Sequence, residues 1–358
     1  MRMLWISMML LGLATVQAGT LSQANAVRAG YEKSLEAWTI KMQLAKGEAA
    51  RREVMAARPM PDVAAKRMWS VISPQLNEEW TIEPAAWFLR IASPLVEVGE
   101  DGLRTPAMRP QIAQVQKTVE KYHLQSRQLA PMCMALVACG DNTSLNLLRK
   151  IESQNPDKKV AGVAALGLAM MAKDINDEPR IMRERLSMLR KAIIDAADVE
   201  IEGVTVAELA EEELYIIRNL SKGRPAPELS GRDSGGRAMS LSSFEGKVVI
   251  LLFWNSGGEG PDAVINWANA LRADERFAGK EFEVVGVNSD PLPVLRKLQA
   301  EGKVDWPNFS DPNNELGKVY RVGAWPLTYV LGADRKIHYI GTTGTFAELT
   351  AAAVLDES

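Results

Sequence analysis

An unbroken apolar run near residue 250 constrains the fold of this chain more than any other feature. Val248 to Trp254 reads Val-Val-Ile-Leu-Leu-Phe-Trp, and the chain continues through Asn-Ser-Gly-Gly-Glu-Gly to Pro261. A strand that is covered on both faces needs such a run, because neither of its faces meets water. The glycines and the proline then predict a turn and the first residue of a helix. The run therefore predicts the central strand of a covered sheet, joined to a helix by a tight turn.

The chain is longer than one ordinary hydrophobic core requires. Its 358 residues predict two domains. A hydrophobic fraction of 47% with 24% charged residues is typical of a globular chain and excludes a largely disordered one. The formal net charge of -3 gives no electrostatic reason to expect nucleic acid or an anionic membrane as a partner. We therefore expect two folded domains and no nucleic-acid partner.

The first 18 residues are typical of a secretory signal peptide. Arg2 supplies a positive start, the stretch from Leu4 to Val16 is apolar, and Val-Gln-Ala18 offers a small-x-small cleavage site. The alternatives are an uncleaved anchor or a buried helix, but the apolar run is short for a membrane span. We expect a mature protein that starts near Gly19, is periplasmic or secreted, and has no stable membrane span.

Residues 19–222 predict an all-helical domain. Alanine and leucine are frequent there, and apolar residues recur at spacings of three and four. Two copies of Leu-Arg-Lys, at residues 148–150 and 189–191, each follow a small alanine-rich helix. That arrangement suits either HEAT- or TPR-like helical hairpins or an irregular bundle. The proline-rich stretch 221–227 cannot continue a helix and therefore predicts the domain boundary.

The two cysteines of the chain, Cys133 and Cys139, lie in one apolar stretch that predicts a helix. In a regular helix, six residues separate them by about 9 Å of rise and place them on different faces. A disulfide needs Cα atoms within about 7 Å, so a bridge would require the helix to break before Gly140. We expect two buried thiols that are not paired.

Residues 223–358 alternate between strand and helix patterns. The apolar run is followed by a helical pattern over 261–272, a second inner strand over 282–288 and a helix over 291–301. The other expected elements are a hairpin of strands 228–233 and 238–241, an extended segment 306–310, a helix 314–320, a hairpin of strands 327–332 and 336–341, and a helix 345–355. This order predicts an α/β domain with a central mixed sheet.

Several motifs of this second domain carry a family resemblance. They are Gly-Arg-Pro-Ala-Pro-Glu-Leu from residue 223, the strand ending Leu-Phe-Trp, Phe-Glu-Val-Val-Gly-Val from residue 282, Tyr-Arg-Val-Gly-Ala-Trp-Pro from residue 320 and Ala-Asp-Arg-Lys-Ile from residue 333. In these motifs the chain resembles the TlpA/ResA-type thiol–disulfide oxidoreductases of the thioredoxin superfamily, which are grouped with the redoxin (AhpC/TSA) domains. The resemblance covers residues 223–358 and implies a thioredoxin-like fold there.

The resemblance also implies that the family's redox pair is replaced in this chain. Members carry Phe-Trp-x-x-Trp-Cys-x-x-Cys, and read without gaps Phe253 and Trp254 match that pattern. Gly257 stands at the second tryptophan, while Gly258 and Pro261 stand at the two cysteines. The family's reaction needs a thiolate at a helix N-terminus and a second thiol that resolves the mixed disulfide. We therefore expect no catalytic residue at these positions.

A surface for an extended peptide is the other implication of the resemblance. The family's cis-proline corresponds to Pro326, and the backbone before it pairs with a peptide strand, a mode that needs no thiol. Trp325 could border such a groove or simply pack over the shortened loop. Glu259 is placed to cap the following helix. The candidate binding residues are Trp254, Gly257, Glu259, Trp325 and Pro326.

Three functions are open to this chain. The first is a non-catalytic thioredoxin-like protein that binds or scaffolds an exported protein or peptide. The second is chemistry related to thiol–disulfide exchange, through Cys133 and Cys139 or through a partner's thiols. The third is a different enzyme, but the sequence offers no metal-ligand cluster and no phosphate loop, and Ser256 has no evident base. We expect no metal and no cofactor.

Overall fold

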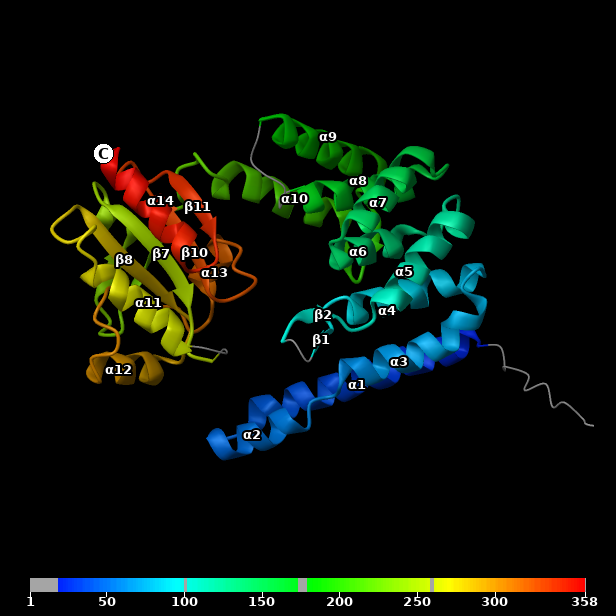
Figure 1. Ribbon diagram of the computed structural model, residues 1–358, viewed down its shortest axis with the longest axis horizontal. Helices are drawn as coiled ribbons and strands as arrows, with labels where there is room; N and C mark the ends of the chain where they lie inside the picture. The colour runs from blue at the N-terminus through cyan, green and yellow to red at the C-terminus, as the bar shows by residue number, and fades with distance from the viewer. Residues whose placement is uncertain (1–18, 100–101, 173–178, 258–260, 358) are drawn as a thin grey trace, which may run out of the picture. The chain divides into compact units, whose positions relative to one another are not determined.

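The structure is a computed structural model that describes residues 19–99, 102–172, 179–257 and 261–357. The expected signal peptide, residues 1–18, lies outside this part of the chain. The chain divides into two compact units, one ending at Ala210 and the other beginning at Glu211 (Figure 1).

The division falls inside helix α10 (Val206–Tyr215), ahead of the boundary predicted at residue 222. The physical reason is that the end of this helical stretch packs into the second unit. Leu220, at the end of a π-helical turn that follows α10, is part of that unit's core. The hydroxyl of Tyr215 donates a hydrogen bond of 3.0 Å to the carbonyl of Val319 in the same unit.

The first unit is mainly helical, as predicted. Its main helices are α1 (Leu21–Leu44), α2 (Glu48–Ala56), α3 (Pro61–Ile72), α4 (Ile82–Ala92), α5 (Arg109–Thr118), α6 (Ala130–Cys139), α7 (Asn142–Gln154), α8 (Lys158–Ala172) and α9 (Pro179–Ala196). Helix α8 packs against α6, α7 and α9. The cap of α7 follows from sequence, because the side chain of Asp141 accepts a hydrogen bond of 2.6 Å from the N–H of Ser144.

Two short hairpins correct the expectation that residues 19–222 are helical throughout. The first pairs β1 (Val96–Val98) with β2 (Arg104–Pro106), and the second pairs β3 (Glu200–Ile201) with β4 (Val204–Thr205). The second hairpin turns at Glu202 and Gly203, which both have positive φ angles of 53° and 84°. Two consecutive residues of positive φ form the turn that suits a tight hairpin, so helical spacing on either side did not reveal it.

The two Leu-Arg-Lys segments occupy similar places in α7 and α9. Leu148 and Leu189 are both fully buried. Lys150 forms an ion pair with Glu120, and Lys191 forms one with Glu152. In each case the lysine reaches back to a glutamate on an earlier helical segment. The similar positions and ion pairs of the two segments agree with a pair of related helical hairpins. That the helical region is a true repeat stays a prediction.

The second unit is built on a mixed sheet of five strands in the order β11-β10-β7-β8-β9. The strands are β7 (Val248–Trp254), β8 (Phe282–Asn288), β9 (Asn308–Ser310), β10 (Leu327–Leu331) and β11 (Ile337–Gly341). Strand β8 is parallel to both β7 and β9, whereas β10 is antiparallel to both β7 and β11. All seven residues of β7 are buried, which confirms the covered central strand that the apolar run predicted.

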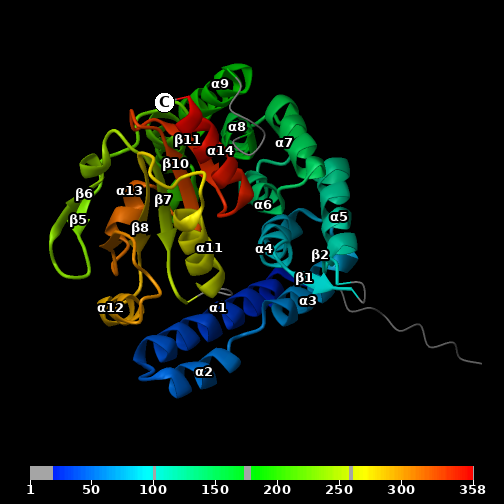
Figure 2. The ribbon, with the colours of Figure 1, turned by 60° about the vertical axis from the view of Figure 1, so that its left-hand side comes forward.

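Alternate residues of β7 enter two different hydrophobic clusters. One cluster contains Ile250, Leu252 and Trp254 and is closed by α11 (Pro261–Ala273) and α14 (Thr345–Asp356). Figure 2 shows these two helices over one face of the sheet. The other cluster, which includes Leu251 and Phe253, is closed by α13 (Glu315–Val319) and the segments around it. Further elements of this unit are α12 (Leu292–Ala300) and a hairpin of β5 (Ser230–Arg232) and β6 (Ala238–Ser240).

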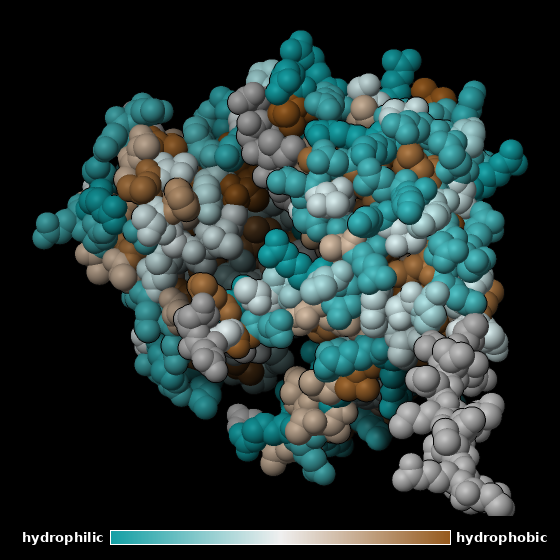
Figure 3. Space-filling model, turned by 45° about the vertical axis from the view of Figure 1, so that its right-hand side comes forward, coloured by the Kyte–Doolittle hydropathy of each residue, from teal (hydrophilic) through white to brown (hydrophobic). Residues whose placement is uncertain are grey.

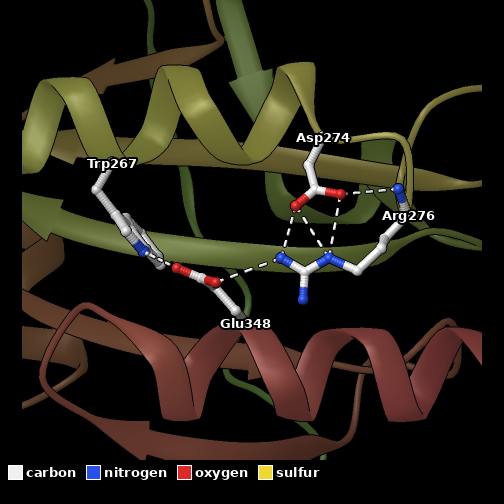
Figure 4. A network of polar contacts seen from close by, with 4 residues as sticks. All are labelled: Trp267, Asp274, Arg276 and Glu348. Carbon is white, nitrogen blue, oxygen red and sulfur yellow. Dashed lines mark hydrogen bonds and ion pairs between the residues drawn. The ribbon is translucent and has the colours of Figure 1, made fainter.

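A polar network joins α11 to α14 (Figure 4). The indole N–H of Trp267 donates a hydrogen bond of 2.6 Å to one carboxylate oxygen of Glu348. The other oxygen of Glu348 lies 3.4 Å from the guanidinium of Arg276, which also pairs with Asp274. The side chain of Glu348 thus lies between Trp267 of α11 and Arg276 of the loop that follows this helix.

Hydrophilic side chains predominate on the face of the molecule drawn in Figure 3, where hydrophobic side chains occur in small groups. Among the described residues, no helix combines the length and the apolar character that crossing a bilayer requires.

Candidate functional site

Three loops of the second unit meet at one edge of its sheet. Strands β7 and β8 are parallel, so their carboxyl ends lie together, and the antiparallel β10 begins at the same edge, with Leu327 opposite Phe253. Ligands of open α/β sheets commonly bind beyond the carboxyl ends of the strands. The segments 255–257, 289–290 and 325–326 are therefore placed together by topology alone.

A groove of about 430 Å³ lies at this edge and is lined by Asn255, Gly257, Ser289, Asp290 and Trp325. The side chain of Trp325 is 38% exposed, so a large aromatic surface is available on one wall. The structure thus brings together Gly257 and Trp325, two of the binding residues expected from sequence.

The bond between Trp325 and Pro326 is cis, which confirms the expectation from the resemblance. Strand β10 begins at the next residue, Leu327. Among the described residues, no hydrogen bond involves the main-chain N–H or C=O of Trp325. These groups can therefore pair with an added strand of peptide.

A buried carboxylate from the loop after β8 holds the turn after β7. The main-chain N–H of Ser256 lies 3.0 Å from each carboxylate oxygen of Asp290, and the Ser256 hydroxyl donates a further bond of 2.9 Å. The amide of Asn288 donates to the same carboxylate at 2.9 Å. Sequence reasoning missed Asp290, although a polar residue two positions after a buried inner strand is a signal for this edge.

The comparisons with known proteins assign the second unit. Residues 222–340 match the AhpC/TSA family. This unit is a redoxin domain of the thioredoxin superfamily. A chloroplastic peroxiredoxin Q from Oryza sativa subsp. japonica is 30% identical over 128 residues, 34% of this chain and 58% of the relative. The thiol-disulfide oxidoreductase ResA from Bacillus subtilis is 25% identical over 130 residues, 36% of this chain and 72% of the relative.

Solved structures resemble the same part of the chain. The thioredoxin domain of a thiol-disulfide oxidoreductase from Bacteroides vulgatus is 23% identical, with a TM-score of 0.35, over 38% of this chain and 99% of that one. A secreted thiol-disulfide isomerase from Corynebacterium glutamicum is 20% identical, with a TM-score of 0.33, over 36% of this chain and 84% of that one. The similarity to peroxiredoxin Q covers only 58% of the length of that relative.

Trp254 supports the groove of the redoxin domain from beneath. Its side chain is 0% exposed, and its indole N–H donates a hydrogen bond of 2.9 Å to the side-chain oxygen of Asn308 on β9. This burial corrects its place among residues that touch a partner, because a side chain inside the core contacts none. The physical reason is the alternation along β7, which turns Trp254 toward the cluster under α11.

The resemblance implies that the family's redox pair corresponds to residues 258 and 261, at the start of α11. Pro261 is the first residue of that helix, whereas Gly258 and Glu259 lie outside the described residues. Neither glycine nor proline carries a nucleophile, and the redoxin domain of this chain contains no cysteine.

Both cysteines lie in α6 of the helical unit and are unpaired, as predicted. Cys133 is fully buried and Cys139 is half-buried. Burial raises the pKa of each thiol to about 12, and the charge of Asp141 adds to the effect at Cys139. A thiol of such high pKa supplies almost no thiolate at neutral pH, so neither cysteine is set up as a nucleophile.

No group of three or more histidine, cysteine, aspartate or glutamate side chains is placed to hold a metal ion in the part of the chain that the structure describes.

Proposed function

We propose that the redoxin domain binds an extended segment of an exported protein or peptide at the groove and performs no thiol–disulfide chemistry there. The observation that carries the proposal is the main chain of Trp325, which borders the groove without a hydrogen-bond partner among the described residues. A peptide strand laid against it gains main-chain hydrogen bonds, and these do not depend on a thiol. Gly257 also lines the groove and, having no side chain, adds no bulk to it.

The loss of chemistry follows from the residues at the family's redox positions. Gly258 and Pro261 stand where the members have cysteines, and neither can form or resolve a mixed disulfide. The structure places a carboxylate, Asp290, against the Ser256 hydroxyl, where sequence offered no base. We do not assign Ser256 as a substitute nucleophile, because the same carboxylate holds the main chain of the turn and no histidine is among the described residues that line the groove. A peroxidatic reaction also needs a cysteine, and this domain has none.

Export is part of the proposal and rests on residues 1–18, whose pattern is that of a cleavable signal peptide. The protein would then work in the periplasm or outside the cell. We assign the helical unit a scaffolding part, because its alanine-rich helices pack closely and its two thiols have a pKa too high for a nucleophile.

The first test measures chemistry on the protein without residues 1–18. It should neither reduce insulin with dithiothreitol as the electron donor nor turn over hydrogen peroxide. Cys133→Ala is the matched control, since it removes a thiol without touching the redoxin domain. Reproducible turnover that disappears in Cys133→Ala would overturn the proposal and support the alternative of residual thiol chemistry.

The second test measures binding. A photo-crosslinking amino acid at position 325 should capture a partner in the exported compartment. The same amino acid at position 294 is the control, because Val294 is 36% exposed, close to the 38% of Trp325, but does not line the groove. Equal capture at both positions would count against the groove as the binding site.

A further inference from the structure

Asp290 carries a buried charge that faces the groove. It is only 6% exposed, yet it is one of the five residues that line the groove. Both of its carboxylate oxygens accept hydrogen bonds, from Ser256 and from Asn288. A carboxylate that only accepts has the hydrogen-bonding pattern of the ionised form.

The charge of Asp290 has no cationic partner among the described residues. Every donor to it is neutral: a main-chain N–H, a hydroxyl and a side-chain amide. No lysine or arginine is among the described residues that line the groove. Buried charges in proteins are usually compensated by an opposite charge, so this carboxylate borders the groove without a cationic side chain beside it.

A second residue of the groove lining, Trp325, is also suited to a cation. Trp325 offers a partly exposed indole, and the face of a tryptophan ring is the aromatic surface that attracts ammonium and guanidinium groups most strongly. Ser289 and Asn255 border the same space and supply oxygen atoms that can accept hydrogen bonds from such a group.

We propose that the groove selects extended segments that carry a lysine or arginine side chain, whose cation lies between Asp290 and Trp325. The proposal rests on the peptide binding proposed above and names the class of segment that is bound. The carboxylate acts through its charge, while its hydrogen bonds continue to hold Ser256 and the turn. Segments with an acidic side chain at the same position are repelled.

The test uses four short, fluorescently labelled peptides of one extended Thr/Val/Ser sequence that differ at their central residue. That residue is lysine, arginine, norleucine or glutamate, so that norleucine matches the lysine stem without its charge. Binding to the full chain is followed by fluorescence polarisation. The lysine and arginine peptides should bind about tenfold more tightly than the norleucine peptide, and the glutamate peptide should bind most weakly. The advantage should shrink as salt is raised, because salt screens partly exposed charges.

Two variants assign the effect to Asp290. Asp290→Asn should bring the lysine peptide down to the affinity of the norleucine peptide. Asp311→Asn is the matched control, because Asp311 is also a buried carboxylate that accepts main-chain hydrogen bonds, from Glu315 and Gly317, but it does not line the groove. It should keep the preference for the cationic peptides.

The possible outcomes distinguish the charge selection from the peptide binding on which it rests. Equal affinity for all four peptides in the unmodified protein would overturn the charge selection and leave peptide binding standing. No binding of any peptide, together with equal crosslinking at positions 325 and 294, would overturn the proposed function itself. If circular dichroism shows that Asp290→Asn does not fold, Trp325→Ala and the salt series test the proposal instead. A preference for the cationic peptides that neither the substitution nor added salt reduces would contradict the proposal.

Discussion

Trp254 and Asn308 are joined by a buried hydrogen bond of 2.9 Å that crosses β8 at Gly286. A Cβ atom at Gly286 would lie 1.8 Å from the side-chain oxygen of Asn308 and 2.9 Å from the indole nitrogen of Trp254. The bond therefore exists only because the residue between the two strands has no side chain. It fixes the last residue of β7 directly before the turn that borders the groove.

Gly286→Ala should lower the free energy of unfolding of the redoxin domain by about 1–3 kcal/mol, because it forces Asn308 away and leaves a buried donor on Trp254 unsatisfied. Urea unfolding followed by tryptophan fluorescence measures the change. Asn308→Ala removes the obstructing oxygen. In a chain that already carries Asn308→Ala, Gly286→Ala should therefore lower the free energy of unfolding clearly less. Additive costs in the double variant would contradict this account.

The thiols predict a loss of stability in alkali. The folded-state pKa of Cys133 and Cys139 is about 12, well above the ordinary value of a thiol in the unfolded chain, because the thiols are buried. The unfolded state therefore releases protons first. The contribution of the two protonated thiols to the free energy of unfolding is complete below about pH 8.5. It is lost as the pH rises from there through about 12.

The measurement is urea unfolding of the helical unit between pH 8 and pH 10.5, in the native protein and in the variant that carries alanine at both cysteines. The variant should show the shallower decline of unfolding free energy with pH. In the folded native protein, iodoacetamide at pH 8 should label Cys139 slowly and Cys133 only through unfolding, since only Cys139 is partly exposed. A disulfide between the two under mild oxidation would refute both the helix geometry and this prediction.

Much of the redoxin fold could be predicted from sequence, because its inner strands are encoded locally. The run from Val248 to Trp254 has no polar residue, and the structure buries all of it. The second inner strand was predicted at residues 282–288, where β8 lies. β7 is buried throughout and β8 from Val284 onward, and burial on both faces leaves a largely apolar pattern that can be read without knowing the partner strands.

The polar part of the groove could not be predicted in the same way. Ser256 and Asp290 are 34 residues apart in sequence, and their hydrogen bonds exist because parallel strands end at one edge. Neither residue has a distinctive local pattern, so their pairing depends on the tertiary fold. Trp254 was misassigned for a related reason: its place beside the turn was clear, but the direction of its side chain depends on the alternation of the strand.

The hydrogen bond between α11 and α14 predicts a small but measurable loss of stability when it is removed. Trp267→Phe keeps the packing of an aromatic ring and removes the hydrogen bond to Glu348, so it should lower the unfolding free energy by about 1–2 kcal/mol. Glu348→Gln is the matched variant, because glutamine retains an acceptor for Trp267 and loses only the charge that faces Arg276. Its cost should be smaller, as exposed ion pairs contribute little. A larger cost for Glu348→Gln in chemical denaturation would reverse this assignment.

Gly258→Cys combined with Pro261→Cys should restore a dithiol that closes to a disulfide. The proposed function assigns the family's pair to these two positions, and they lie where the structure joins a strand to a helix: β7 ends at Trp254 and α11 begins at Pro261. A thiol just ahead of a helix gains from the partial positive charge of the helix N-terminus, which favours its thiolate. Mass spectrometry after mild oxidation, with alkylation of the remaining thiols, reads out the bond. The two single variants are the controls and should show no new intramolecular bridge. If the double variant keeps two free thiols under oxidant, the turn no longer has the geometry of the family, and the groove would then need an explanation other than a redoxin site that lost its cysteines.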